Sequence, residues 1–324
     1  MKSNASSKLA ALVVAGTVSG YAGTWQALEP LPAPNGGMVC GAADGKILVI
    51  GGTNWETDPK KNWLDTVQRF DPATQRWTLA GRLKQPLAYG TGATLGSSFV
   101  VVGGSTGAGP FAGVVRCENG KITDQPAGGV STPAVLSAGG GIGDEIIVVG
   151  GSDDAANLKG FSTKACAWNV RTGQVRVLAP IPGEDFGTAA SAVIGGDVYV
   201  FGGVTWDAKK EGVRNLARAW VYSSAGNRWR ELKALPQALR GTAAAVLNDR
   251  YIYLGGGFAE NDFVDQGLVY DIQADRYLPS RPLPYKSAPH LVREGDFVYC
   301  LGGEDRIKHR SNAAYRIKAS DLLP

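Results

Sequence analysis

The chain has 324 residues, 45 of them glycine, and a domain of this size buries about 75% of its unfolded surface without needing a disulfide or metal. The net charge is +4, but the 33 basic residues are interspersed with 29 acidic ones. The one basic cluster, residues 306–310, has no row of aromatic residues beside it, so the composition argues against nucleic-acid binding.

The first twenty-two residues differ from the rest of the chain. Lys2 and Lys8 precede an apolar run over residues 9–18, and the segment 20–22 has the character of a signal peptidase site. The run is too short to span a membrane. We therefore expect a signal peptide over 1–22, periplasmic or secreted localisation, and one domain over 23–324. The alternative is a disordered tail.

Six apolar runs end in paired glycines, and successive pairs lie about fifty residues apart. Val, Ile and Tyr are concentrated before each pair, as expected for strands. A repeat of this period is typical of a kelch β-propeller. The sequence therefore predicts an all-β, six-bladed propeller. The pairs are Gly51–Gly52, Gly103–Gly104, Gly150–Gly151, Gly202–Gly203, Gly255–Gly256 and Gly302–Gly303.

The two ends of the repeat pattern complement each other. Residues 23–28 predict a strand with no glycine-pair strand ahead of it, and the last repeat stops near Ile317 without a fourth strand. One N-terminal strand added to three C-terminal strands closes the ring and removes exposed sheet edges. We therefore expect a 3+1 closure in the last blade.

The third strand of most repeats carries an aromatic residue. We expect these residues to occupy one structural position and to pack between neighbouring blades. The second repeat, residues 90–125, is degenerate, because its third strand reads VVRC and no Trp follows. The aromatic residues are Phe70, Trp168, Tyr222, Tyr270 and Tyr315.

The cysteines and histidines do not form a metal-binding pattern. Four cysteines fall in predicted strands without C-x-x-C spacing, and only His290 and His309 are histidines. We expect buried thiols and no metal or cofactor, which argues against a copper oxidase built on a kelch propeller. Whether Cys117 and Cys166 pair is left open.

The strand order of a propeller blade gathers several segments at one mouth of the ring. These are the loops after the glycine pairs, the long loop over 53–65, and the starts of the inner strands at Tyr89, Phe186, Arg240 and His290. Only the last glycine pair is followed directly by a carboxylate, Glu304, with Arg310 six residues further on. Spacing alone favours an ion pair on a surface loop, because a carboxylate and a basic residue six positions apart are common.

Two segments resemble the cyclically permuted mutarotases, which are relatives of bacterial N-acetylneuraminate epimerase. Residues 51–104 carry NW-x-D, W-x-x-AG-x-L and PLAYG, and residues 301–317 carry G-E-x5-R. The resemblance implies that Glu304 is the proton acceptor and Arg310 its catalytic partner. Two departures leave the sugar open: residues 182–186 lack the arginine of the family, and Ser105 replaces a second glutamate.

Further residues suit an acidic sugar. Trp faces stack on sugar rings, and a Lys adds positive charge. The alternative is that the Trp residues only anchor their loop. The candidates for substrate binding are Trp55, Lys61, Trp63, Tyr89, Arg240 and His290, with Arg214 a weaker one.

Two functions remain in competition. The first is an exported mutarotase or epimerase that interconverts anomers of N-acetylneuraminate or a related keto-sugar by general acid–base catalysis, with a small acidic sugar as its partner. The second is a non-catalytic propeller that binds a glycan or protein through its loop-rich face, because fold alone does not give function. The sugar and the oligomeric state are open.

Overall fold

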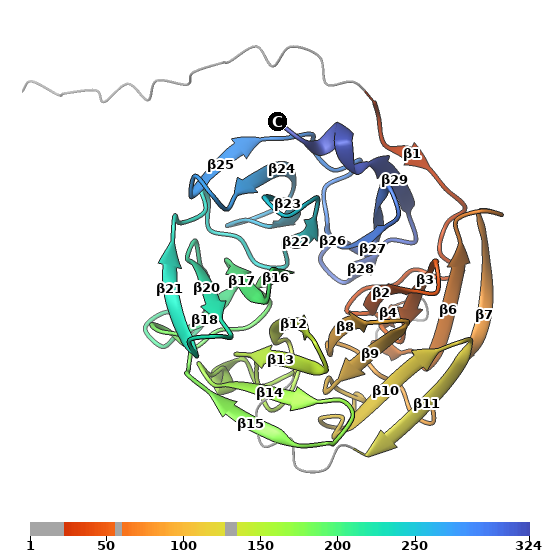
Figure 1. The fold of residues 1–324 in the computed structure, drawn as a ribbon, viewed down its shortest axis with the longest axis horizontal. Coiled ribbons are helices and arrows are strands. Elements are labelled where there is room, and N and C mark those ends of the chain that lie inside the picture. The colour runs from red at the N-terminus through yellow and green to blue at the C-terminus, as the bar shows by residue number, and fades with distance from the viewer. Residues whose placement is uncertain (1–22, 56–59, 127–134) are drawn as a thin grey trace, which may run out of the picture.

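The computed structural model describes residues 23–55, 60–126 and 135–324, and the expected signal peptide lies outside these residues. Six antiparallel sheets are arranged as blades around a central axis (Figure 1), which confirms the predicted six-bladed, all-β propeller. Among the described residues no helix is long or apolar enough to cross a membrane. Among the described residues no cysteine forms a disulfide, so Cys117 and Cys166 do not pair.

Each blade has four main strands, which follow one another from the central channel outward. Blade one contains β2 (Val39–Ala43), β3 (Lys46–Ile50), β6 (Thr66–Asp71) and β7 (Arg76–Arg82). Blade two contains β8 (Thr91–Leu95), β9 (Ser98–Val102), β10 (Gly113–Glu118) and β11 (Lys121–Pro126). Blade three contains β12 (Ala138–Ile142), β13 (Glu145–Val149), β14 (Ala165–Asn169) and β15 (Val175–Leu178).

The remaining blades follow the same order. Blade four contains β16 (Ala190–Ile194), β17 (Asp197–Phe201), β20 (Ala219–Ser223) and β21 (Arg228–Leu232). Blade five contains β22 (Ala243–Val246), β23 (Tyr251–Phe258), β24 (Phe263–Asp271) and β25 (Arg276–Pro279). Blade six contains β26 (Ala288–Glu294), β27 (Phe297–Arg306), β29 (Ala314–Lys318) and β1 (Gln26–Ala27).

Short elements decorate the ring. A β-hairpin of β4 (Thr53–Asn54) and β5 (Asn62–Trp63) lies in the long loop of blade one, and β18 (Val204–Asp207) pairs with β19 (Gly212–Asn215) in blade four. Strand β28 (His309–Arg310) pairs with the end of β27. Two 3-10 helices, η1 (Leu158–Gly160) and η2 (Ala319–Leu322), complete the described elements.

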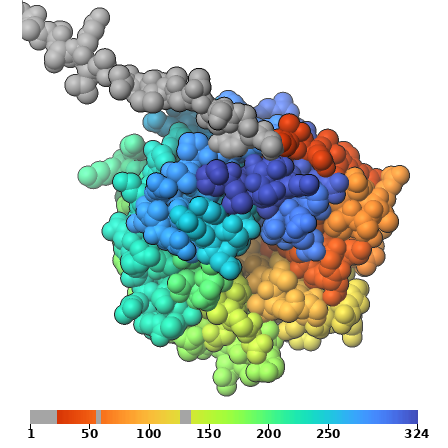
Figure 2. Space-filling view, turned by 45° about the horizontal axis from the view of Figure 1, so that its top comes forward, coloured from red at the N-terminus to blue at the C-terminus, as the bar shows by residue number. Residues whose placement is uncertain are grey.

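The N-terminal strand β1 supplies the outer strand of blade six. Gln26 pairs with Arg316 of β29, and Ala27 pairs with Tyr315. The Trp25 indole N–H donates a hydrogen bond to the Pro282 carbonyl at 2.8 Å. Figures 1 and 2 show this N-terminal segment beside the C-terminal blade. The two ends of the described chain are therefore joined within one sheet.

The glycine pairs turn the chain sharply within or after the second strand of each blade: in blades one to four the strand ends there, whereas β23 and β27 continue beyond the pair. Gly51 has a φ of +59°, and a Cβ built on it would lie 1.8 Å from the Leu87 carbonyl oxygen of the next blade. Only glycine fits such a close approach. In blade five the two glycines with positive φ are Gly256 (+64°) and Gly257 (+117°), whereas Gly255 does not have a positive φ, so the predicted pair is displaced by one residue.

Aromatic side chains pack between neighbouring blades as expected, with one exception. Phe70 lies opposite Ile47 in β3 and packs against Tyr299 of blade six, with ring centroids 6.1 Å apart. In blade six the equivalent residue is Ile317, which lies opposite Val298. Tyr315 is two residues away and packs on Tyr285 instead. The prediction that Tyr315 shares the common position is therefore wrong.

A buried ion pair fixes the turn after β24. Asp271 has no accessible surface and accepts hydrogen bonds from Arg250 Nε at 2.9 Å and Arg250 Nη2 at 2.7 Å. Its carboxylate also accepts the backbone N–H groups of Gln273 and Ala274. The Arg250 guanidinium is the main reason that the pKa of Asp271 falls to about 2.

We expect Asp271→Asn to lower the unfolding temperature by a few degrees at pH 7. A carboxyl whose folded pKa is depressed stabilises the protein above its unfolded pKa of 3.8, and this stabilisation is lost as the pH falls towards 2. Melting curves between pH 7 and 2 should therefore converge for variant and wild type. Asp144→Asn, which removes an exposed ion pair with Arg171, is the control. Equal curves at pH 7 would contradict the prediction.

Candidate active site

The central channel opens into a cavity of about 390 Å³ at one mouth of the ring. Its walls are the starts of the inner strands of all six blades. Glu304 and Arg310 of blade six also line it, together with His290 and Tyr89. The structure therefore brings four of the predicted site residues to one cavity.

Glu304 and Arg310 face each other across a short hairpin. Strand β27 continues past its glycine pair and turns back as β28, so that Glu304 pairs with Arg310 in register. Arg310 Nη1 lies 2.6 Å from Glu304 Oε2. The backbone N–H of Lys308 donates to the other carboxylate oxygen, Oε1, at 3.1 Å. Glu304 is thus held at the cavity wall by a cation and by its own hairpin.

Arg310 is enclosed on two sides. Its side chain is only 6% exposed, and its Cζ lies 4.7 Å from the centroid of the Trp55 ring. On the other side it rests on the backbone of Gly36, where a Cβ would lie 2.4 Å from Arg310 Cδ. Arg310 Nε is buried without a hydrogen-bond partner in the described part of the chain. The guanidinium is therefore fixed in place while part of its donor capacity is unused.

The four candidates in and after the long loop cluster beside this pair. Lys61 Nζ lies 5.1, 5.6 and 5.5 Å from the ring centroids of Trp55, Trp63 and Tyr89, and it donates to the Tyr89 hydroxyl at 3.3 Å. Trp63 packs edge-on against Tyr89. Of these four, only Tyr89 lines the central cavity, whereas Trp55 lines a smaller adjoining one of about 190 Å³. Arg310 lines both cavities.

His290 lies on β26 and lines the central cavity. Part of its ring faces the channel, but the surrounding protein still removes much of the solvation that an imidazolium would need. This burial, with the positive charge of Arg310, lowers the pKa of His290 to about 4. His290 is therefore neutral near pH 7 and presents one hydrogen-bond donor and one acceptor to the cavity.

We expect His290→Gln to flatten the acid dependence of stability. An unfolded histidine has a pKa near 6.5. Above pH 6.5 His290 is neutral in both the folded and the unfolded protein, so it does not reduce the free energy of unfolding. As the pH drops from 6.5 towards 4, only the unfolded protein gains the proton, so the free energy of unfolding falls. Unfolding temperatures measured between pH 7 and 4 should decline by a few degrees less in the variant. Parallel declines in the two proteins would contradict this prediction.

Arg240 lies outside the central cavity. Its guanidinium stacks on Phe258 at 4.2 Å and donates to Asn215 Oδ1 at 2.9 Å. It lines a separate cavity of about 340 Å³ with Arg214, which is ion-paired to Glu184. Burial lowers the pKa of Arg240, and the negative charge of Glu304 opposes that shift. The structure therefore does not place the Arg240 side chain in the lining of the central cavity.

Phe186 was expected at the mouth but is fully buried. Arg218 stacks on its ring, with Cζ 4.3 Å from the centroid, and Arg218 Nη1 donates to the Glu184 carbonyl at 2.8 Å. An arginine therefore contacts the segment 182–186, which lacks one of its own. Arg218 is absent from the lining of the central cavity, so it does not replace the family's arginine there.

A collar of backbone hydrogen bonds links the blades at the mouth. Four residues at the starts of inner strands each donate their N–H to the carbonyl of the corresponding residue in the preceding blade. The bonds run from Tyr89 to Gly37 at 2.7 Å, Leu136 to Tyr89 at 2.9 Å, Thr188 to Leu136 at 2.8 Å and Gly241 to Thr188 at 3.0 Å. Tyr89 has a φ of +62° here, a conformation that bulky residues rarely adopt.

The collar stops at blade six. Pro289 stands at the position equivalent to Gly241, and proline has no N–H to donate. Pro289 follows Ala288, the residue that pairs with Glu304. The ring of backbone bonds therefore opens beside the Glu304–Arg310 pair.

Sequence reasoning missed the hydroxyl groups of the cavity wall. Thr188 and Thr242 line the cavity, as do Ser137 and Ser191. Thr188 Oγ1 is buried and has no partner among the described residues. The repeat pattern did not reveal them, because only Ser137 and Thr242 stand at equivalent positions of their blades. Such hydroxyls suit the hydrogen-bonding needs of a polyol.

The described residues contain no cluster of three or more His, Cys, Asp or Glu side chains suited to a metal ion. What the cavity does offer is a carboxylate able to exchange a proton, a guanidinium able to hold an anion, and hydroxyls around them.

The chain matches the kelch motif over residues 34–84 and 186–236. It is 28% identical over 165 residues to N-acetylneuraminate epimerase of Haemophilus influenzae strain 86-028NP, covering 47% of the chain and 44% of that protein. It is 33% identical over 99 residues to N-acetylneuraminate epimerase of Yersinia enterocolitica, covering 30% of the chain and 25% of that protein.

A third relative, spermatocyte protein spe-26 of Caenorhabditis elegans, is 23% identical over 273 residues, which cover 80% of the chain and 36% of that protein. The chain thus spans less than half the length of these curated relatives. The six blades that carry glycine pairs and the two matches to the kelch motif indicate the same repeat architecture. The chain is therefore a kelch-repeat protein that is similar to the N-acetylneuraminate epimerases.

Proposed function

We propose that the protein is a sugar mutarotase or epimerase that interconverts the anomers of N-acetylneuraminate or a related acidic keto-sugar. The observation that carries the proposal is the Glu304–Arg310 pair at the channel wall, 2.6 Å apart and set among hydroxyl and aromatic side chains. The names of the epimerase relatives support the same class of substrate. The proposal includes export, as the segment 1–22 predicts.

The chemistry requires one proton to leave and one to arrive. Glu304 accepts the proton of the anomeric hydroxyl and passes it to the ring oxygen as the bond between that oxygen and the anomeric carbon breaks, which gives an open-chain ketone. Rotation about the adjacent bond and closure on the other face give the second anomer, with the proton returned. Arg310 holds the sugar carboxylate through its fork of donors. The spontaneous reaction is already feasible, so a sparse site is sufficient.

Nuclear magnetic resonance of the sugar tests the proposal directly. The α-anomer of N-acetylneuraminate, freshly released from an α-glycoside, is mixed with purified protein, and the growth of the β-anomer signal is followed. Relaxation faster than in buffer supports a mutarotase. A rate equal to that of buffer, for this sugar and for a panel of acidic keto-sugars, would contradict catalysis.

The second candidate function is non-catalytic binding through the same face. One observation favours it: Ile307, at the tip of the β27–β28 hairpin on the rim of the mouth, is 76% exposed. An apolar side chain at this position is available to contact a bound glycan or protein, and a contact surface would also have to include the loops beside it, because single exposed apolar residues are common on protein surfaces. Saturable binding of a sialylated glycan without any change in anomer exchange would favour this function over catalysis.

A further inference from the structure

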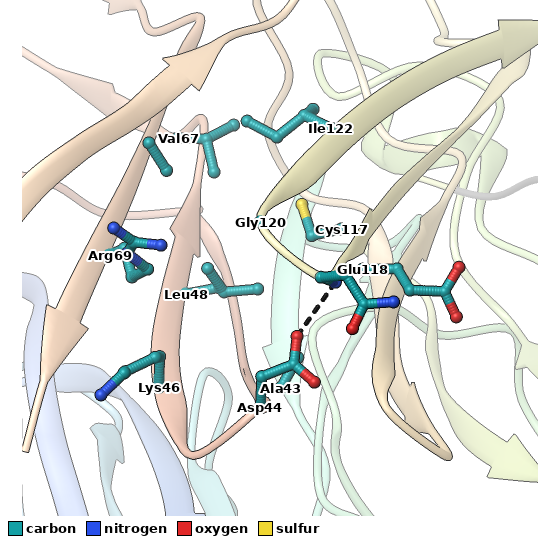
Figure 3. A pocket seen from close by; sticks show the side chains of 12 residues that line it. Ala43, Asp44, Lys46, Leu48, Val67, Arg69, Cys117, Glu118, Gly120 and Ile122 are labelled. Carbon is teal, nitrogen blue, oxygen red and sulfur yellow. Dashed lines mark hydrogen bonds between the residues drawn. The ribbon is translucent and has the colours of Figure 1, made fainter.

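A crevice of about 500 Å³ lies between blades one and two. Strands β2 and β10 both run away from the mouth, so the turns that border the crevice, 43–46 and 118–121, lie on the opposite face of the ring. Figure 3 shows Leu48 and Arg69 on one side of it and Cys117 and Ile122 on the other. Its apolar lining consists of Ala43, Leu48, Val67, Ala80, Cys117 and Ile122.

The crevice exists because blade two lacks a feature of the other blades. In each blade, one residue of the third strand and its cross-strand partner in the fourth pack against the preceding blade. In blade two this pair is Cys117 and Ile122. The other pairs are Phe70 with Trp77, Trp168 with Val175, Tyr222 with Trp229 and Tyr270 with Tyr277, while Ile317 and Trp25 share one core cluster in blade six. The space that an aromatic ring fills elsewhere is therefore left open beside Cys117.

Most charges around the crevice are already engaged. Lys46 pairs with Asp71 at 2.9 Å. Glu118 accepts a hydrogen bond from the Ser98 hydroxyl at 2.7 Å. Asp44 accepts the backbone N–H of Asn119 at 3.0 Å, the bond drawn in Figure 3.

Arg69 differs from these groups. It lies on β6 in the crevice wall and is half-buried. Within the described part of the chain its guanidinium forms no ion pair and no side-chain hydrogen bond. Arg69 is therefore the one cation of this lining without an ionic partner, and it stands beside an apolar slot, whereas the carboxylates of Asp44 and Glu118 accept hydrogen bonds from neutral donors.

We propose that this crevice binds a small planar aromatic carboxylic acid. The ring occupies the space between Leu48 and Val67 on blade one and Cys117 and Ile122 on blade two, where other blades carry a ring of their own. The carboxylate pairs with the Arg69 guanidinium, which offers a planar fork of donors. An apolar slot with one oriented polar group is the usual form of a small-molecule site. This site is separate from the channel and does not depend on the function proposed there.

The test uses indole-3-acetate and its neutral analogue indole-3-acetamide as probes on the purified protein. Ligand-observed magnetic resonance and calorimetry should show that the acid binds at least tenfold more tightly than the amide, because an ionised group strengthens the hydrogen bonds to Arg69. Arg69→Gln should remove this preference. Loss of the preference without loss of amide binding would assign the charge recognition to Arg69.

Two variants fill the slot in different ways. Cys117→Tyr and Ile122→Trp each restore an aromatic ring at the interface, and each should abolish binding of both probes while the protein keeps a cooperative thermal transition. Val175→Trp makes the same change at the equivalent position of blade three, where Trp168 already fills the space, and should leave binding unchanged. The proposal is overturned if the wild type binds neither probe at millimolar concentration. It is also overturned if both filled variants fold and bind the acid as the wild type does.

Discussion

Glu304→Gln should slow protein-catalysed anomer exchange by roughly 10²- to 10⁴-fold, which is the usual contribution of a general acid–base group. The amide keeps the size of the carboxylate and can still accept a hydrogen bond from Arg310, whose Nη1 lies 2.6 Å from Oε2. It cannot accept the proton of the anomeric hydroxyl. The measurement is the rate at which α-N-acetylneuraminate relaxes, with the buffer rate subtracted.

A matched control separates chemistry from folding. Glu145 is also ion-paired to an arginine, Arg176, at 2.8 Å, and its side chain is 28% exposed against 30% for Glu304. It lies at the start of β13, on the face opposite the mouth. Glu145→Gln should therefore leave the exchange rate unchanged. If Glu304→Gln relaxes the sugar as fast as the wild type, the catalytic assignment of Glu304 is wrong.

Arg310→Met should weaken binding of the acidic sugar by roughly 10- to 100-fold, because a hydrogen bond to a charged group contributes about 1.5–3 kcal/mol. The free energy of unfolding of the variant should also be lower by about 1–3 kcal/mol, because Arg310 is only 7% exposed and packs between Trp55 and Gly36. Titration calorimetry gives the affinity, and urea denaturation gives the free energy of unfolding.

Arg310→Lys distinguishes the two roles of this side chain. A lysine keeps the positive charge but loses the planar fork and the stacking on Trp55, so affinity should recover only in part. Arg176→Met, in the ion pair on the opposite face, is the control and should change neither affinity nor rate. Affinity for the sugar that is unchanged in Arg310→Met would remove Arg310 from the binding site.

The glycine pairs were sufficient to predict the fold, because each one marks the same point of a repeating unit. Glu304 and Arg310 could be located for the same reason: a residue directly after a glycine pair must lie at the mouth, and the hairpin register brings its partner opposite. Arg240 was misplaced because a strand's start fixes its backbone, whereas stacking on Phe258 decides where its guanidinium lies.

The remaining errors arise from register. Tyr315 resembles the other aromatic residues in sequence, but a displacement of two residues keeps a side chain on the same face of a strand while moving it along the sheet. The true equivalent, Ile317, carries no aromatic signal. The collar was invisible for a different reason, since backbone hydrogen bonds between blades leave almost no trace in side-chain identity. Pro289 alone marks where they end.

The pairing of β1 with β29 also sets the order in which the molecule can be completed. Arg316 Nε donates to Gln26 Oε1 at 3.1 Å across a sequence separation of 290 residues. Local blades can form during synthesis, but this contact has to wait until almost the whole chain has emerged from the ribosome. Strand β1 is therefore among the last of the described strands to find its neighbour, and until β29 is in place both of its edges are exposed to whatever holds the nascent protein.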